Sequence, residues 1–304
     1  MSLDAELYEE RRRKWRRSGF WRGVGLTVLI LIGLGVLGAL LGDPEPRGPH
    51  VARHVVSGII VNDPDRTALI ADMAEDDDVR ALILYIESPG GTTVGSEALY
   101  EAVRLVAEEK PVVAVMGEIA ASGGYITALA ADHIVARGNT LTGSIGVIIE
   151  YPRITGLMEQ LGIEWETVRS GDVKGGISPF RDTTAEERAI EQAIVEDSYD
   201  WFVGLVTERR GLSGGALETV TDGRVFTGRQ AIEAGLIDAI GGQREAESWL
   251  ADIDPALSEL PVRTVSLPEE DPGLADLLLS AGGLDDLVSG GLLHRYRRLL
   301  SVTE

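Results

Sequence analysis

The sequence contains no cysteine, and only three of its 28 lysine and arginine residues are lysines. The absence of cysteine excludes disulfide bonds, a thiol nucleophile and cysteine-ligated zinc. Aromatic residues make up only 5% of the chain, and 49 acidic residues give a net charge of −21. This charge has the opposite sign to a nucleic-acid-binding surface, so we expect no nucleic-acid partner. With 304 residues, 44% of them hydrophobic, the chain can form one ordinary globular domain with short appendages.

An apolar stretch near the N-terminus, residues 23–41, contains no charged residue. As a helix it would be about 28 Å long, close to the hydrocarbon thickness of a bilayer. It follows a basic tail, residues 1–22, and precedes a linker, residues 42–54. The positive-inside rule therefore predicts an uncleaved, single-pass signal anchor in the cell membrane, with a cytoplasmic tail and an extracytoplasmic domain. A cleaved signal peptide is the alternative, but the apolar stretch is longer than the usual hydrophobic region of a signal peptide, and no Ala-x-Ala cleavage site follows it.

Residues 55–250 alternate between short β-branched runs and helical stretches, which indicates an α/β fold with a mostly parallel, buried sheet. A long helix is expected after an N-cap at Thr183 or Thr184. Residues 251–304 are predicted to form an amphipathic tail that either packs on the domain or binds a partner. The expected strands are 55–61, 81–87, 112–116, 133–136, 145–149 and 165–169, and the shorter expected helices are 64–74, 94–108, 123–131 and one beginning near residue 152.

Ser122 is the candidate nucleophile of the domain. It follows the expected strand 112–116 and stands at the start of an expected helix, between small residues. Such a setting gives a hydroxyl a tight, glycine-lined approach, and the N–H of Gly123 could bind a developing oxyanion. The alternative is that Ser122 only caps the helix.

A pair of glycines, Gly90 and Gly91, follows the expected strand 81–87. Adjacent glycines at a strand–helix junction allow a tight turn and expose consecutive N–H groups, which an oxyanion hole requires. Such junctions are also common for steric reasons alone. The segment is not a Walker loop, because no Gly-Lys-Ser/Thr follows it.

A lysine, rather than a histidine, is the candidate base. Lys174 lies in the glycine-rich segment 170–176, and a lysine desolvated in an apolar site can accept a proton near neutral pH. The alternative is an ordinary solvated loop lysine. Thr142 or Ser144, in another loop of small residues, could orient its ammonium group. The histidines lie in the linker, an apolar strand and the tail, without an evident carboxylate partner: His50, His54, His133 and His294.

Together these segments resemble the signal peptide peptidase A family of membrane-anchored serine proteases, relatives of the Clp protease and crotonase-type folds. The resemblance covers residues 52–250, and the length fits the short form of the family, with one catalytic domain after one membrane span. It implies a Clp protease/crotonase-like fold for the domain. The segments that carry the resemblance are 87–91, 121–125, 142–147, 170–174 and 222–231.

The resemblance also implies roles for the candidate residues. Ser122 matches the nucleophile, Lys174 the general base, and Ser144 the hydroxyl that orients the lysine. In this family the subunits assemble into a bowl-shaped ring, and in the short form the serine and the lysine come from neighbouring protomers. The implied substrates are remnant signal peptides and other hydrophobic membrane-associated peptides, cleaved without a cofactor or a metal.

The oxyanion hole implied by the resemblance consists of Gly90 or Gly91 together with the N–H of Gly123.

Three alternative functions remain open from the sequence. A related Ser-Lys membrane protease that clips stomatin-type proteins is the nearest. The second is a crotonase-like acyl-CoA hydratase or isomerase; the predicted membrane anchor, Ser122 and Lys174 argue against it. An inactive membrane scaffold is the third.

Overall fold

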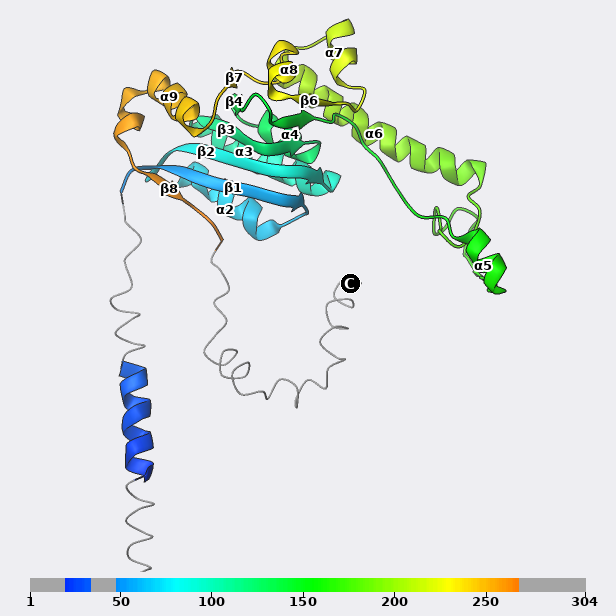
Figure 1. Ribbon diagram of the computed structural model, residues 1–304, viewed down its shortest axis with the longest axis horizontal. Coiled ribbons are helices and arrows are strands. Elements are labelled where there is room, and N and C mark those ends of the chain that lie inside the picture. Colours follow the sequence, from blue (N-terminus) through cyan, green and yellow to red (C-terminus); the bar gives the residue numbers. More distant parts are fainter. Residues whose placement is uncertain (1–19, 34–47, 268–304) are drawn as a thin grey trace, which may run out of the picture. The chain divides into compact units, whose positions relative to one another are not determined.

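The computed structural model describes residues 20–33 and 48–267, and the chain divides into two units after Pro49 (Figure 1). In the first unit, residues 20–33 are helical. No helix within residues 20–33 and 48–267 is both long enough and apolar enough to cross a membrane. Only part of the expected span, residues 23–41, is described, because residues 34–41 lie outside the described residues. Most of the basic tail also lies outside them. The membrane anchor therefore stays a prediction.

A mixed sheet of eight strands forms the centre of the second unit (Figure 1). The strands are β1 (His50–Ile60), β2 (Val79–Gly91), β3 (Val112–Ala121), β4 (His133–Ala136), β5 (Leu141–Gly143), β6 (Val225–Thr227), β7 (Ala239–Ile240) and β8 (Val262–Thr264). Their order is β6-β5-β3-β2-β1-β8, and β4 pairs with both β3 and β7. Only β5 and β6 are antiparallel, and the other described pairs are parallel. The prediction of an α/β fold with a mostly parallel sheet is confirmed.

Both faces of the sheet are covered, which explains why its central strands are apolar without interruption. Leu82, Ile83 and Leu84 are all fully buried, although successive side chains of a strand point to opposite faces. One core cluster joins the sheet to α2 (Pro64–Glu75), α3 (Thr93–Glu109), α4 (Gly123–Leu129) and α6 (Ala185–Arg210). The other joins it to α9 (Gln243–Ile253) and the 3₁₀ helix η1 (Pro255–Glu259). The remaining helices are α5 (Thr155–Leu161), α7 (Gly214–Val220) and α8 (Gly228–Glu233).

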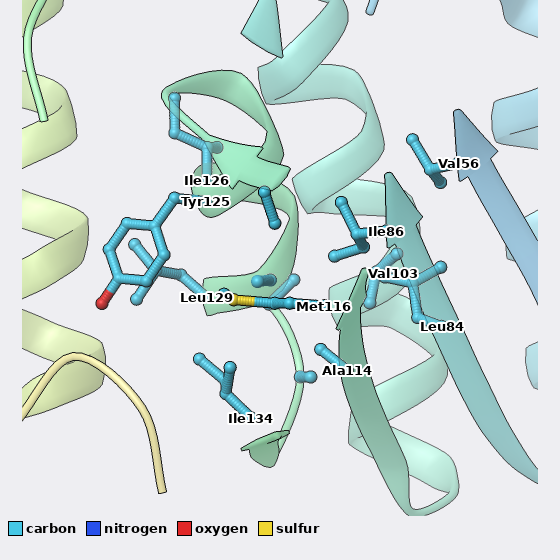
Figure 2. Close-up of a cluster of buried hydrophobic side chains, with 14 of the residues drawn as sticks. Val56, Leu84, Ile86, Val103, Ala114, Met116, Tyr125, Ile126, Leu129 and Ile134 are labelled. Atoms are coloured by element: carbon cyan, nitrogen blue, oxygen red, sulfur yellow. The ribbon is translucent and has the colours of Figure 1, made fainter. Parts of the chain in front are cut away.

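The first core cluster fixes the position of α4 against the sheet (Figure 2). Tyr125, in the first turn of α4, is fully buried, and its hydroxyl donates a hydrogen bond to the carbonyl oxygen of Leu236 at 2.8 Å. Burial raises the pKa of Tyr125, so its phenol stays protonated and can keep this bond. Leu129 and Met116 pack in the same cluster. Ser122, the residue just before α4, therefore adjoins a helix whose position is fixed by the core.

The long helix α6 begins at a capping residue and ends at a glycine. Thr184 and Glu187 form a capping box, as expected from the sequence, and Gly211 ends the helix in the left-handed conformation at φ 65°. The C-terminal half of α6 is packed: Phe202 and Val206 are buried. In the N-terminal half only Glu187 is buried, and Figure 1 shows this half extending away from the sheet toward α5.

Two expected strands, 145–149 and 165–169, do not form, and both predictions were wrong. The chain leaves the sheet at Ser144, whose φ of 51° is incompatible with an extended strand. The apolar run that follows is therefore coil. In the second segment, Trp165 stacks on Phe180, with ring centroids 4.4 Å apart, so its side chain packs locally rather than in a sheet.

Other elements differ from expectation mainly at their boundaries. β1 begins at His50, so the end of the expected linker belongs to the sheet, and the helix expected near residue 152 begins at Thr155. Residues 251–267 contribute the end of α9, η1 and β8 to the domain. The rest of the expected tail, 268–304, lies outside the described residues. Strands β5 to β8 were not predicted, since runs of two or three residues carry almost no periodic signal.

Candidate active site

Ser122 lies at the junction between β3 and α4, where the sequence predicts a nucleophile. Its backbone has φ 52° and ψ −118°, a region that residues with a side chain rarely adopt. Ser122 occupies the N-cap position of α4, but its side chain makes no capping hydrogen bond. A simple cap would make that bond, so the structure favours a reactive role for this half-buried hydroxyl.

Backbone hydrogen bonds join Ser122 to the loop that carries Ser144. The N–H of Ser122 donates to the carbonyl oxygen of Gly143 at 2.9 Å, and the N–H of Ser144 donates to that of Arg224 at 2.9 Å. Ser122 and Ser144 both have a positive φ. The structure thus brings these two predicted site residues to the same junction, although Ser144 does not line the cavity described below.

The three glycines predicted for the oxyanion hole surround Ser122. Gly90 has φ +113°, and a Cβ on it would lie 2.9 Å from the Cβ of Ser122 and 3.0 Å from the nitrogen of Gly123. A Cβ on Gly123 would lie 2.2 Å from the hydroxyl oxygen of Ser96 and 3.2 Å from the nitrogen of Gly91. No side chain fits at either position. Glycine is therefore required for the two backbones to approach the serine this closely.

The predicted donors of the oxyanion hole are not equivalent. The N–H of Gly90 already donates to the hydroxyl oxygen of Ser88 at 3.1 Å. Gly123 is the first residue of α4, and the first N–H groups of a helix have no acceptor within the helix. The geometry therefore favours the N–H of Gly123, with the neighbouring Gly91, over that of Gly90.

A cavity of about 100 Å³ opens beside Ser122. Its walls come from the start of α4, the coil after β5 and the middle of α6. The described residues that line it are Gly91, Thr93, Ser96, Ser122, Gly123, Ile126, Gly146, Val147, Ile148, Ser198, Trp201 and Phe202, and none of them is charged. The cavity can therefore receive a small uncharged side chain, but it offers the serine no base.

A second hollow of about 320 Å³ adjoins this cavity, since both are lined by Val147 and Ile148. It lies between the coil 147–151 and the exposed half of α6, where it also touches Arg188 and Glu191. The run 145–149, which resembles a strand in sequence, therefore crosses the mouth of the site. An extended peptide could follow this hollow to Ser122.

Lys174 lies apart from Ser122 within one chain. Its side chain is exposed, in a turn between α5 and α6, and it does not line either hollow. Figure 1 shows the segment between these two helices at the end of α6 that is farthest from the sheet. A single copy of the chain thus keeps the two predicted catalytic residues separate.

The histidines of the described part of the chain do not substitute for Lys174. His54 is buried in β1, where its Nδ1–H donates to the carbonyl oxygen of Val265 at 2.8 Å. His133 stacks on Trp249 and has its Nδ1 3.9 Å from a carboxylate oxygen of Asp238. Burial lowers the pKa of both imidazoles. None of the three described histidines, His50, His54 and His133, lines the cavity at Ser122. The carboxylate near His133 is a partner that the sequence did not reveal.

Several residues of the site were not singled out by sequence. Trp201 and Phe202 lie on α6 and line the cavity, but hydrophobic periodicity alone cannot tell a core face from a cavity wall. Ser96 and Ser198 also line the cavity, and isolated serines on helices carry no signal of such a position.

Two family models match the chain. The model of peptidase family S49 matches residues 104–256, and that of the Clp proteases matches residues 52–143. The first range includes Ser122, Ser144 and Lys174. The second spans β1 to β5, so the domain has a Clp protease-like α/β fold with a mixed sheet.

Similar proteins carry protease names. A protein of Synechocystis sp. named "Putative protease slr0021" is 39% identical over 214 residues, which cover 69% of this chain and 77% of that protein. "Putative signal peptide peptidase SppA" of Enterococcus faecium is 38% identical over 173 residues, 57% of this chain and 50% of that protein. Among solved structures, a membrane-bound stomatin-specific protease is 16% identical with a TM-score of 0.48, covering 73% of this chain and 99% of its own.

Proposed function

The chain belongs to peptidase family S49 and is by that membership a serine peptidase, and we propose that it cleaves peptides through Ser122 and Lys174. The observation that carries this proposal is the geometry of Ser122. The side chain of this serine makes no capping hydrogen bond, its φ is positive, and it stands between close-packed glycines beside an uncharged cavity. These are the features of an activated hydroxyl rather than of a structural one.

In the first half of the reaction, the hydroxyl oxygen of Ser122 attacks the carbonyl carbon of the scissile peptide bond. Its proton passes to the neutral amine of Lys174. The negative charge on the carbonyl oxygen is stabilised by the N–H groups of Gly123 and Gly91. The C–N bond then breaks, the lysine returns its proton to the leaving amine, and an ester remains on Ser122.

In the second half, a water molecule attacks this ester and gives a proton to Lys174. The same N–H groups stabilise the second oxyanion. The ester C–O bond breaks, Ser122 recovers its proton from the lysine, and the product leaves as a carboxylic acid. Each proton that Lys174 accepts is therefore returned within the cycle.

The lysine of each site is supplied by a second copy of the chain. The exposure of Lys174 and its absence from the cavity support this arrangement. The segment near Lys174 also exposes apolar side chains, including Trp165 (54% exposed) and Val168 (fully exposed), which a neighbouring copy would cover. Assembly into a ring is then a condition for activity.

The substrates of this site are apolar peptides, above all the remnants of signal peptides. The uncharged walls of the cavity and the name of the Enterococcus relative support this choice. The basic tail followed by the apolar residues 23–41 supports a single-pass membrane anchor with the domain on the extracytoplasmic side. That location would place the site beside peptides released from the membrane.

A fluorophosphonate probe, which reacts covalently with activated serine hydroxyls, tests the proposed nucleophile. The full chain in detergent should be labelled at Ser122, as identified by mass spectrometry of the modified peptide. A hydratase or an inactive scaffold would not react. Labelling confined to a serine outside the β3–α4 junction, or none at all, would refute the assignment of Ser122.

A further inference from the structure

The start of α6 contains a buried carboxylate among exposed residues. The side chain of Glu187 is only 1% accessible, whereas its neighbours Glu186 and Arg188 are exposed. Between Glu187 and Phe202, α6 buries no other residue. The capping box uses one carboxylate oxygen, Oε2, which accepts from the N–H of Thr184 at 3.0 Å. The other oxygen is left for further partners.

Two arginines of the preceding segment bind this carboxylate. Arg181 donates to Oε2 at 2.7 Å and also, through a shorter bond, to Oε1. Arg169 donates to Oε1 at 3.2 Å. The hydrogen bond from Arg181 is the main reason why the pKa of Glu187 is lowered to about 2. Glu187 therefore stays ionised near neutral pH.

The same two arginines hold the backbone around Lys174. Arg169 donates to the carbonyl oxygen of Asp172 at 2.9 Å, and Arg181 donates to that of Gly176. These carbonyls lie two residues before and two residues after the lysine. We call the two arginines, together with the carboxylate that joins them, the arginine clamp.

A general base must be held within hydrogen-bond distance of the hydroxyl it deprotonates, and a displacement of about 1 Å can cost about a hundredfold in rate. The loop that carries Lys174 belongs to no helix or strand. We propose that Glu187 is a positioning residue, which fixes Lys174 for proton transfer through the arginine clamp. This inference rests on the proposed role of Lys174 as the base.

The substitution Glu187→Gln tests the clamp in the full-length protein. Glutamine has nearly the same size and also fits a capping box, so α6 should keep its start, but the two arginines lose the charge that joins them. We expect kcat for a peptide substrate to fall about 10- to 100-fold, with KM within about twofold, because residues 171–176 line neither hollow. The matched control Glu186→Gln removes a charge from the same turn outside the clamp and should keep the wild-type kcat.

Hydrogen exchange of residues 171–176 provides a readout that does not depend on catalysis. The N–H of Lys174 donates to the carbonyl oxygen of Gly171 at 3.1 Å, and that of Gly176 to Val173 at 3.2 Å. Exchange of these amides should become faster in Glu187→Gln and stay unchanged in the control. Arg169→Gln leaves the capping box intact and should produce a smaller change of the same kind, so the test survives if Glu187→Gln fails to fold.

The outcomes separate the clamp from the mechanism on which it rests. More than half of the wild-type kcat in Glu187→Gln, or a loss of kcat without faster exchange in 171–176, overturns the clamp. If Lys174→Arg is inactive while Glu187→Gln is fully active, the Ser-Lys mechanism stands and the clamp is wrong. If Lys174→Arg is active, the proposed function itself fails.

Discussion

Peptidase activity is expected to fall at least about a thousandfold when Ser122 is replaced by alanine. In the proposed mechanism this hydroxyl forms the covalent intermediate, and no other described residue of the cavity has that role. The fold should persist, because the side chain of Ser122 makes no capping hydrogen bond that would be lost. The measurement is the hydrolysis rate of a fluorogenic apolar peptide, together with the melting temperature of each protein.

Ser213→Ala is a matched control for this substitution. Ser213 also occupies a helix N-cap without a side-chain capping bond, at the start of α7, but it is exposed and does not line the cavity. Its replacement should leave the hydrolysis rate unchanged. If Ser122→Ala kept more than a few per cent of the wild-type rate with a normal melting temperature, Ser122 would not be the nucleophile.

The substitution Lys174→Arg should be nearly as damaging, although it preserves the positive charge. A guanidinium group does not release its proton near neutral pH, so arginine cannot accept the proton of Ser122. Lys174 is exposed within its own chain, so the exchange should not disturb the fold of that chain. We expect a loss of at least about a hundredfold in kcat, measured with the same peptide, at an unchanged melting temperature.

Lys110→Arg shows whether the domain tolerates this exchange elsewhere. The ammonium group of Lys110 donates to the carbonyl oxygens of Met73 and Asp76, at 2.6 and 2.5 Å, which a guanidinium group can also bind. Its activity should therefore stay close to that of the wild type. If Lys174→Arg were active, Lys174 would provide only a positive charge and would not act as the proton acceptor.

The central part of the fold was predictable because local and global signals agree there. The strands around Ile83, Val113 and Val135 are buried on both faces, so they read as uninterrupted apolar runs. Helix α6 was predictable from the capping residues Thr184 and Glu187. The coil 145–149 was not, because a β-branched run that lines a hollow has the same composition as one that lies in a sheet.

Part of the geometry around Ser122 was predictable from the sequence, and part was not. The glycines next to Ser122 mark the close approach of two backbones, which no residue with a Cβ permits. That the N–H of Gly90 is already bound to Ser88 depends on a local turn without a sequence signature. The clamp around Glu187 joins residues 169, 181 and 187 of an irregular segment, for which periodicity gives no register.

Complementation between two inactive variants tests most directly whether each site is shared by two copies of the chain. Chains carrying Ser122→Ala and chains carrying Lys174→Ala are co-expressed in equal amounts, and the mixed assemblies are assayed against each variant alone. If serine and lysine come from different copies, about a quarter of the sites contain both residues, and about a quarter of the wild-type activity should appear. Activity no higher than that of the two separate variants would contradict a shared site and would place both residues in one chain.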